Sequence, residues 1–448
     1  MRHDTLRVFM ATVAQMDLEC HQVDVNNAFT ESSLSEEIYM QPPAGVDVLP
    51  GQVLHVQRSL YGLKQAARDW NKTCFKALFR MGFTQSEADP CLLMHPAKGL
   101  IILVYVDDIT IAAKDIKQIS WFKDAFSQIF KIKDLGELSM ILGVRVTRDR
   151  KRGTLRLDQT HYVKSTLAKL LMEKDTHRPT KSPMDSYDDL KPAKLTDVRC
   201  NKTIYQEGVG SWMYLGILTR PDVAFALGRL SQFLADPTVH HMSALKKLGR
   251  YIRSSQDLGI LYTRNDHQTL EGYSDSDFAM DRTDRVSILG NVFTLAGGPI
   301  SWMSKKQKSV ATSTMEAEYM AMCACAKQSQ WLVQILRDMG MHHLIGKDHS
   351  SPLVKENLKY SGESPTNDKP VALKGDNQAA LSLIQDAHTT DRSKHIDIAF
   401  HYVRMLWQRR KITVQFVGTE DMVADGFTKP KGRDSMQQFV RQLGLVED

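Results

Sequence analysis

The sequence predicts a chain of mixed α and β structure in which an α+β region precedes an α/β region. Helical stripes of apolar residues alternate with short apolar strands up to about residue 173. Residues 174–203 are rich in Pro, Asp, Lys and Thr without periodicity, which indicates an exposed connection. From about residue 266 the order of elements becomes β-β-β-α-β-α-β-α, which is typical of a mixed sheet with helices on its faces.

In the first region, each predicted element follows from its apolar spacing. Residues 5–18 and 60–83 carry apolar side chains at helical spacing, and Gly82 ends the second of these helices. The segment 99–113 combines two apolar strands around a turn. The other predicted elements are a strand within 21–29, a helix at 119–130 and strands within 135–149 and 154–159.

The later regions are interpreted in the same way. Two helices with apolar stripes are predicted at 220–237 and 240–254. Residues 346–370 form a polar, loop-like insertion. The α/β region contains predicted strands within 270–278, 287–297, 299–304, 371–376 and 411–418, and predicted helices at 314–339, 377–385 and 420–427.

Composition sets broad limits on the class of protein. The chain has 448 residues, which is enough for two to four domains of roughly 100–200 residues each. Its net charge of +6 is compatible with a polyanionic partner without requiring one. The six cysteines contain no C-x-x-C pair, so we expect no zinc site or disulfide framework and a reducing, intracellular compartment. No apolar run is long enough for a membrane span, and the N-terminus lacks the layout of a signal peptide, so we expect no membrane partner.

A first set of acidic residues lies beside the apolar strands of the α+β region. Asp24 ends a predicted strand, and Asp107 and Asp108 lie at the turn of a hairpin more than eighty residues later. Turn aspartates are common, so a plain turn is one interpretation. The strands beside this turn are apolar enough to be buried, and buried carboxylates need compensation. A site for divalent cations is the other interpretation, and both remain open at this point.

These residues lie in motifs that resemble the polymerase blocks of copia-type LTR retrotransposons. Tyr105-Val106-Asp107-Asp108 is similar to the YxDD box of reverse transcriptases. Five further blocks match in order and spacing, and similarity to the family continues along nearly the whole chain: "HQVDVNNAF", "EEIYMQPPAG", "SLYGLKQAARDW", "GFTQSEADPCL" and "LGELSMILGVRV". The resemblance implies a right-hand polymerase with a palm and a thumb.

The resemblance also implies roles for individual residues. Asp24 and Asp107 would be metal ligands, and Asp108 belongs to the same box. Phe29 matches the bulky residue that excludes a ribose 2′-hydroxyl, although a core phenylalanine is the alternative interpretation. The remaining implied residues contact the nucleotide (Tyr61, Gly62 and Tyr105) or grip the primer terminus (Leu142 and Gly143).

A second set of acidic residues lies in the α/β region, where the blocks resemble the ribonuclease H of the same family. These blocks include "GYSDSDFA", "STMEAEYMA", "GDNQAAL" and "VADGFTKP". Taken singly, each acid would be a surface residue. The resemblance implies a ribonuclease H-like fold with a mixed five-stranded sheet, and a catalytic, metal-binding set of Asp275, Glu318, Asp376 and Asp425. We expect Glu316 to lie outside this set.

Other polar residues of this region are given lesser roles. Asp277, Asp281 and Asp284 are expected to be surface acids or acids that support the metal ligands from nearby. His395 and Asp397 resemble a family block, and a structural role is preferred for them. No histidine is found in the loop before Asp425, where bacterial-type enzymes carry one.

The expected cofactor is Mg²⁺, two ions per site, with Mn²⁺ as a substitute. The expected partners are an RNA template, a DNA primer, an RNA–DNA hybrid and deoxynucleoside triphosphates; the oligomeric state is not predicted. Clusters of Lys and Arg beside aromatic residues would contact phosphates, although solvated helix faces explain any one cluster equally well. The clusters lie in "SLYGLKQAARDW", "SKKQKS", "LKKLGRYIR" and "WQRRKI".

The expected organisation is a palm with partial fingers at 1–118, a thumb at 119–173, a connection at 174–265 and a ribonuclease H-like domain at 266–448. Because no complete fingers segment precedes Asp24, we expect an N-terminally truncated copy. Two functions follow from the resemblance. One is an RNA-directed DNA polymerase with ribonuclease H activity, located in cytoplasmic virus-like particles and also in the nucleus. The other is a remnant without polymerase activity that binds nucleic acid or keeps only ribonuclease H activity.

Overall fold

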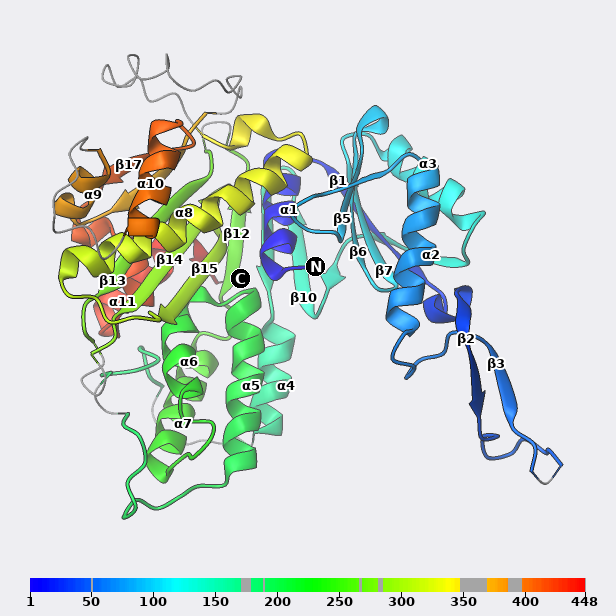
Figure 1. Cartoon of the computed structure of the whole chain (residues 1–448), viewed down its shortest axis with the longest axis horizontal. Coiled ribbons are helices and arrows are strands. Elements are labelled where there is room, and N and C mark those ends of the chain that lie inside the picture. Colours follow the sequence, from blue (N-terminus) through cyan, green and yellow to red (C-terminus); the bar gives the residue numbers. More distant parts are fainter. Residues whose placement is uncertain are drawn as a thin grey trace. The chain divides into compact units, whose positions relative to one another are not determined.

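A computed structural model shows two compact units (Figure 1). The first unit contains Met1–Leu6 and Met16–Leu138, and the second contains Arg7–Gln15 and Ser139–Asp448. The helix α1 (His3–Gln15) therefore contributes to both units. The structure describes residues 1–49, 51–170, 179–187, 190–265, 268–280, 285–346, 369–385 and 397–447.

The first unit is built on a six-stranded antiparallel sheet in the order β4-β5-β6-β7-β1-β8. Helices α2 (Ala66–Arg80) and α3 (Ile116–Ser127) pack on one face of this sheet, and their apolar stripes form its core. A separate hairpin pairs β2 (Ser33–Met40) with β3 (Leu54–Arg58). The strands of the sheet are β1 (Glu19–Val25), β4 (Thr84–Gln85), β5 (Leu92–His95), β6 (Leu100–Tyr105), β7 (Asp108–Ala113) and β8 (Ile132–Glu137).

The second unit begins with a five-stranded antiparallel sheet in the order β18-β12-β11-β10-β9. Its strands come from distant parts of the sequence: β9 (Met140–Ile141), β10 (Val144–Asp149), β11 (Thr154–Asp158), β12 (Gly259–Thr263) and β18 (Leu445–Val446). Between β11 and β12, the described residues form the helices α4 (Thr160–Lys169), α5 (Lys202–Leu218), α6 (Ala224–Ser231) and α7 (Val239–Ser254).

A mixed sheet in the order β15-β14-β13-β16-β17 forms the rest of the second unit. β13, β14 and β15 are antiparallel neighbours, whereas β16 runs parallel to both β13 and β17. The long helix α8 (Thr314–Asp338) packs on β13 and β14, and α10 (Asp397–Gln408) packs against α8 (Figure 1). The strands are β13 (Glu271–Asp277), β14 (Ile288–Leu295), β15 (Gly298–Lys306), β16 (Val371–Gly375) and β17 (Ile412–Phe416).

The chain closes with short elements that differ from the sequence expectation. A helix was expected at 420–427, but the structure has two 3-10 turns there, η8 (Thr419–Asp421) and η9 (Val423–Phe427). The helix α11 (Arg433–Gln442) and the strand β18 then follow, and neither was expected. The helix α9 (Gln378–Gln385) agrees with the expected helix at 377–385.

The compact units also divide the chain differently from the expected domains. The first unit ends after Leu138 rather than at residue 118, because α3 packs on its sheet and β8 pairs with β1. The expected thumb and connection share one sheet with the C-terminal β18, because β12 pairs with both β11 and β18. Most of the polar insertion expected at 346–370 lies outside the described residues. No helix in the described part of the chain is long and apolar enough to cross a bilayer.

Candidate active sites

Two neighbouring strands bring the first acidic residues together. In the antiparallel pair of β1 and β7, Asp24 lies directly opposite Asp108. Asp107 lies in the two-residue turn between β6 and β7, and its carbonyl accepts a hydrogen bond of 2.9 Å from the backbone N–H of Val25. This bond ties the turn to the end of β1. The hairpin and β1 therefore place all three aspartates at one end of the sheet.

The turn that carries Asp107 has an unusual backbone. Val106 has φ of 58°, in the left-handed region that β-branched residues rarely adopt. Its carbonyl accepts a hydrogen bond of 2.6 Å from the indole nitrogen of Trp70 on α2. Trp70 is itself buried in the core. The core thus holds a strained turn in place, and strain of this kind is concentrated at functional sites.

Burial and mutual repulsion act on the carboxylates of the first site. Partial burial raises the pKa of Asp24, and the charge of Asp107 raises it further, while Lys133 opposes the shift. The pKa of Asp108 is also raised by burial and by both other aspartates, against a hydrogen bond of 3.1 Å from the amide of Gln22. A bound cation would relieve this repulsion.

The residues expected to contact a nucleotide lie in the same unit. The ring centroids of Phe29 and Tyr61 are 4.5 Å apart. Phe29 is partly buried against the core, whereas Tyr61 is exposed; partial burial and then the nearby charge of Asp107 raise the pKa of the Tyr61 hydroxyl. Gly62 has φ of 98°, which a residue with a side chain would rarely adopt. Tyr105 is exposed at the end of β6.

The two residues expected at the primer grip form the turn between β9 and β10 in the second unit. Leu142 and Gly143 both have positive φ, of 48° and 66°. The hydroxyl of Tyr214 on α5 donates a hydrogen bond of 2.6 Å to the carbonyl of Leu142, so the helix fixes the position of this turn.

The second set of acids forms a compact cluster. Asp275 lies on β13, Glu318 in the second turn of α8, and Asp376 directly after β16. One carboxylate oxygen from each of these three lies within 4.8 Å of the others. In the described part of the chain, this is the one group of three or more such residues gathered so closely.

The electrostatic cost of this cluster is large. Burial, followed by the charges of Asp425 and Asp376, raises the pKa of Asp275 to about 7, although the hydroxyl of Thr428 donates a hydrogen bond to this carboxylate. Burial and the charges of Asp275 and Asp376 raise the pKa of Glu318 to about 9. Carboxylates that share a site in this way favour a divalent cation or a bound proton.

Asp425 is placed differently from the other three. It is buried in η9, and its two carboxylate oxygens are paired with Lys429 at 2.5 Å and with Lys431 at 2.6 Å. Its charge still raises the pKa values of Asp275 and Glu318, so it belongs to the same electrostatic environment. The sequence predicted that Asp425 is a metal ligand. In this structure, both of its carboxylate oxygens are paired with lysines.

The donor set of the second cluster suits a hard divalent cation. Asp275, Glu318 and Asp376 offer carboxylate oxygens, the ligand type that Mg²⁺ and Mn²⁺ accept. Their crowding in a largely buried position leaves negative charge that the hydrogen bond from Thr428 only partly offsets. The residues present therefore fit the implied metal.

The remaining predicted residues occupy other positions. Glu316 accepts hydrogen bonds from the backbone N–H and hydroxyl of Thr312, so it caps the start of α8 and lies outside the cluster. Asp277 is half-buried at the end of β13, and burial raises its pKa. Asp397 begins α10. Asp281, Asp284 and His395 lie outside the described residues.

Several supporting residues were missed in the sequence. They are Gln22, which binds Asp108, and Trp70, which holds the Val106 turn, in the first unit. In the second unit they are Thr428, Lys429 and Lys431. The stretch "FTKPK" after Asp425 carries a signal, because two lysines so close to a buried acid are candidates for pairing with it.

Comparisons with known proteins identify the family of the chain. A family model described as reverse transcriptase (RNA-dependent DNA polymerase) matches residues 1–185. The chain is 33% identical over 456 residues to the retrovirus-related Pol polyprotein from transposon TNT 1-94 of Nicotiana tabacum, in a match that covers 98% of this chain and 32% of that protein. It is 34% identical over 453 residues to the corresponding polyprotein from transposon RE1 of Arabidopsis thaliana, in a match that covers 100% of this chain and 29% of that protein.

One solved structure was also similar. It is a foamy viral protease–reverse transcriptase in complex with double-stranded DNA, with 10% identity, a TM-score of 0.47, and coverage of 90% of this chain and 57% of that one. By the match to the family model, residues 1–185 are a reverse transcriptase-like domain. The chain belongs to the family of retrovirus-related Pol polyproteins from copia-type transposons. It spans about a third of the length of the curated relatives it matches.

Proposed function

We propose that the chain carries out phosphoryl transfer at two sites of a retrotransposon Pol polyprotein. At the first site, Asp24, Asp107 and Asp108 would support RNA-directed DNA synthesis. At the second, Asp275, Glu318 and Asp376, with Asp425 nearby, would support cleavage of RNA in an RNA–DNA hybrid. The observation that carries the proposal is the pairing of Asp24 with Asp108 beside the strained Asp107 turn, inside the segment that matches the reverse transcriptase model.

The proposed cofactor is Mg²⁺, with Mn²⁺ as a substitute. Asp24 and Asp107 would hold it at the first site, with Asp108 beside them, and Asp275, Glu318 and Asp376 would hold it at the second. Bound divalent cations would make the attacking hydroxyl or water more acidic and offset charge on the phosphate.

The protein's own groups position the reactants at the first site. The hydrogen bond from Gln22 orients the carboxylate of Asp108, and the hydroxyl of Tyr61 lies close enough to Asp107 for that charge to raise its pKa. The ring of Phe29 packs against Tyr61 and would exclude a ribose 2′-hydroxyl by its bulk, which would select deoxynucleoside triphosphates. Gly62 and Tyr105 would line the same nucleotide site, and Leu142 and Gly143 would contact the primer.

At the second site, the hydroxyl of Thr428 fixes the carboxylate of Asp275. Lys429 and Lys431 hold Asp425 and lower the repulsion around the cluster. Their cationic groups would also attract the phosphates of a bound hybrid. The proposed partners are an RNA template, a DNA primer, an RNA–DNA hybrid and deoxynucleoside triphosphates.

One observation favours a second candidate function. The tight group of three carboxylates is found in the second unit, within the described residues, and not around Asp24. A protein that retains only hybrid cleavage, or that only binds nucleic acid, would account for this difference.

A paired assay tests the proposal. Primer extension on an RNA template and cleavage of an RNA–DNA hybrid are measured with Mg²⁺ for the wild type, Asp107→Asn and Glu318→Gln. We expect Asp107→Asn to abolish extension and keep cleavage, and Glu318→Gln to do the reverse. Cleavage without extension in the wild type would select the second candidate, and absence of both activities would contradict both enzymatic proposals.

A further inference from the structure

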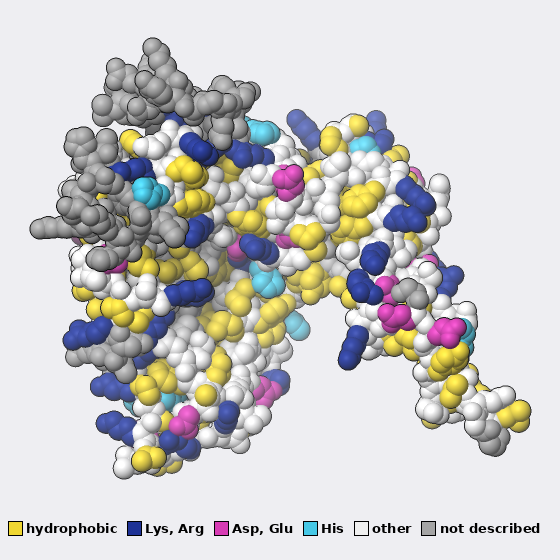
Figure 2. Space-filling model, in the orientation of Figure 1, with side chains coloured by type: hydrophobic (Ala, Val, Ile, Leu, Met, Phe, Trp, Pro, Cys, Tyr) yellow, Lys and Arg dark blue, Asp and Glu magenta, His cyan; other side chains and the backbone are white. Residues whose placement is uncertain are grey.

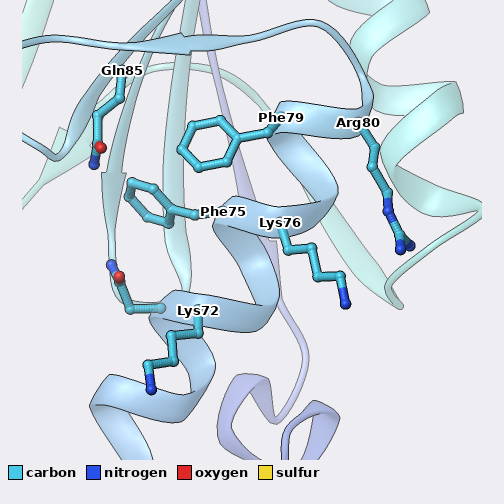
Figure 3. Close-up of a pocket in the computed structure, with 7 residues that line it drawn as sticks. Lys72, Phe75, Lys76, Phe79, Arg80 and Gln85 are labelled. Carbon is cyan, nitrogen blue, oxygen red and sulfur yellow. The ribbon is translucent and has the colours of Figure 1, made fainter.

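A groove on the surface of the first unit combines aromatic and basic side chains. It encloses a cavity of ≈570 Å³ beside helix α2 and strand β4. Figure 3 shows the rings of Phe75 and Phe79 in the space between the helix and the strand that carries Gln85, with three basic side chains on the same helix. None of its lining residues belongs to either acidic site.

The basic side chains follow a regular spacing. Lys72, Lys76 and Arg80 are four residues apart, so they form one stripe along α2 with a rise of about 6 Å between neighbours. That rise is comparable to the distance between neighbouring phosphates of a single nucleic-acid strand. All three are exposed, and none forms an ion pair with any residue that the structure describes.

The floor of the groove is aromatic. Phe75 is buried and packs into the core, whereas Phe79 is 47% exposed. Their ring centroids are 6.1 Å apart. An exposed phenylalanine ring supported by a buried one offers a stable face on which a base can stack. The lining contains no acidic residue, and its other polar groups are the amides of Asn71 and Gln85.

We propose that this groove binds single-stranded nucleic acid, with bases stacked on Phe79 and phosphates paired with Lys72, Lys76 and Arg80. Uncompensated positive charge at phosphate spacing beside an exposed ring is the combination that such strands require. Figure 2 shows several Lys and Arg side chains, and a few Asp and Glu side chains, on the surface of this unit. The inference goes beyond the proposed function because it requires neither acidic site.

Binding to the groove can be separated from binding elsewhere by comparing two ligands. The first ligand is a fluorescein-labelled duplex. The second is the same duplex with a 15-nucleotide single-stranded overhang, which is RNA in one set of titrations and DNA in another. Anisotropy titrations between 50 and 200 mM KCl use the full chain, the variant Lys72→Gln/Lys76→Gln/Arg80→Gln and the variant Phe79→Ala. The variant Lys114→Gln/Lys117→Gln/Lys151→Gln removes the same charge from exposed positions outside the groove.

We expect the overhang to increase wild-type affinity, and both groove variants to reduce that gain about tenfold. The triple groove variant should also lower the slope of log affinity against log salt by about 2, because three phosphate contacts are lost. The control should keep the overhang-dependent gain. An oligonucleotide with 5-bromouracil should cross-link to the peptide that contains Phe79.

Equal overhang-dependent gains in the wild type and both groove variants would overturn the proposal. The proposal would also be overturned if the groove variants changed only the self-association of the chain, measured by sedimentation. The groove would then contact a second copy of the chain. Primer extension and hybrid cleavage in the same samples test the proposed function separately. Their absence with a retained overhang effect would leave the groove supported.

Discussion

At the residue scale, the carboxyl group of Glu318 shows how closely the second cluster depends on a counterion. Its pKa is raised to about 9, chiefly by burial and then by Asp275 and Asp376. The folded protein therefore binds this proton more tightly than the unfolded chain does. Without metal, the contribution of Glu318 to stability is complete below its ordinary pKa of 4.5 and is lost as the pH rises through about 9.

Glu318→Gln should remove this dependence. In EDTA, the wild type should lose about 2–3 kcal/mol of stability between pH 6 and pH 8 that the variant retains, a difference of roughly 4 °C in Tm for a unit of this size. The measurement is thermal unfolding at both pH values, with Glu316→Gln as a control because Glu316 caps the same helix from outside the cluster. If the wild type and Glu318→Gln showed the same pH dependence of Tm, the carboxyl group of Glu318 would not be buried beside Asp275 and Asp376 as described.

Phe29 permits a second test at this scale. Because its ring lies 4.5 Å from that of Tyr61, its replacement by Val would open space beside the nucleotide site. The preference for deoxynucleotides over ribonucleotides, as a ratio of kcat/KM values in primer extension, should fall by about tenfold or more. A loss of Tm with an unchanged ratio would instead support the core interpretation, since Phe29 also packs against the core.

At the element scale, the β6–β7 hairpin holds a strained residue to position an acid. Val106 adopts φ of 58° and is 37% exposed. Packing of its side chain therefore gives little stability to offset the backbone strain. Strain of this kind costs about 1–3 kcal/mol. The indole of Trp70 and the N–H of Val25 bind the two carbonyls of this turn and hold it in place.

Val106→Gly should therefore stabilise the protein by about 1 kcal/mol, or a few degrees in Tm, and should slow primer extension because Asp107 is held less firmly. Ala296→Gly is the matched control, since Ala296 has φ of 52° in the hairpin of β14 and β15. It should leave extension unchanged. A fall in Tm for Val106→Gly would show that the turn is not strained.

The elements that the sequence predicted have a clear apolar pattern. The helix α2 has an apolar stripe at helical spacing, and β6 and β7 are short, continuous apolar runs that are buried almost throughout. The helix α5 was missed although its buried residues form one stripe, because apolar residues such as Ile204 and Ile217 are also exposed on its other faces and the stripe contains Gly208 and Gly216. These glycines are needed for packing: a Cβ on Gly208 would lie 2.8 Å from Leu245, and one on Gly216 would collide with Leu227.

The candidate sites show the same limit. Acids that end apolar strands, such as Asp24 and Asp376, stand out in the sequence because charge there conflicts with burial. Lys429 and Lys431 give only a weak signal, their closeness to Asp425 in the sequence, since lysines near a chain reversal are usually ordinary surface residues. Their pairing with Asp425 depends on the 3-10 turn η9, where a regular helix was expected.

At the scale of the whole molecule, segments from both ends of the chain complete the second unit. Leu445 and Val446 add an edge strand beside β12, and Arg7–Gln15 belongs to the same unit. Arg7 is buried, and its guanidinium donates hydrogen bonds to the carbonyls of Ile300 at 2.8 Å and Ile217 at 2.5 Å. It also lies 3.8 Å from the centre of the Trp302 ring. One side chain thus joins β15 to the end of α5.

Arg7→Ala should destabilise the second unit selectively, because the buried carbonyl of Ile300 and the partly buried carbonyl of Ile217 would lose a charged donor, at a cost of about 3 kcal/mol. Hydrogen exchange of amides in β15 and α5 should become about a hundredfold faster, while that of the β6–β7 hairpin should stay unchanged. Arg68→Ala is the control, since the Arg68 side chain is 62% exposed. Equal acceleration in both units would mean that they unfold as one, and the unit boundary after Leu138 would then not be an energetic boundary.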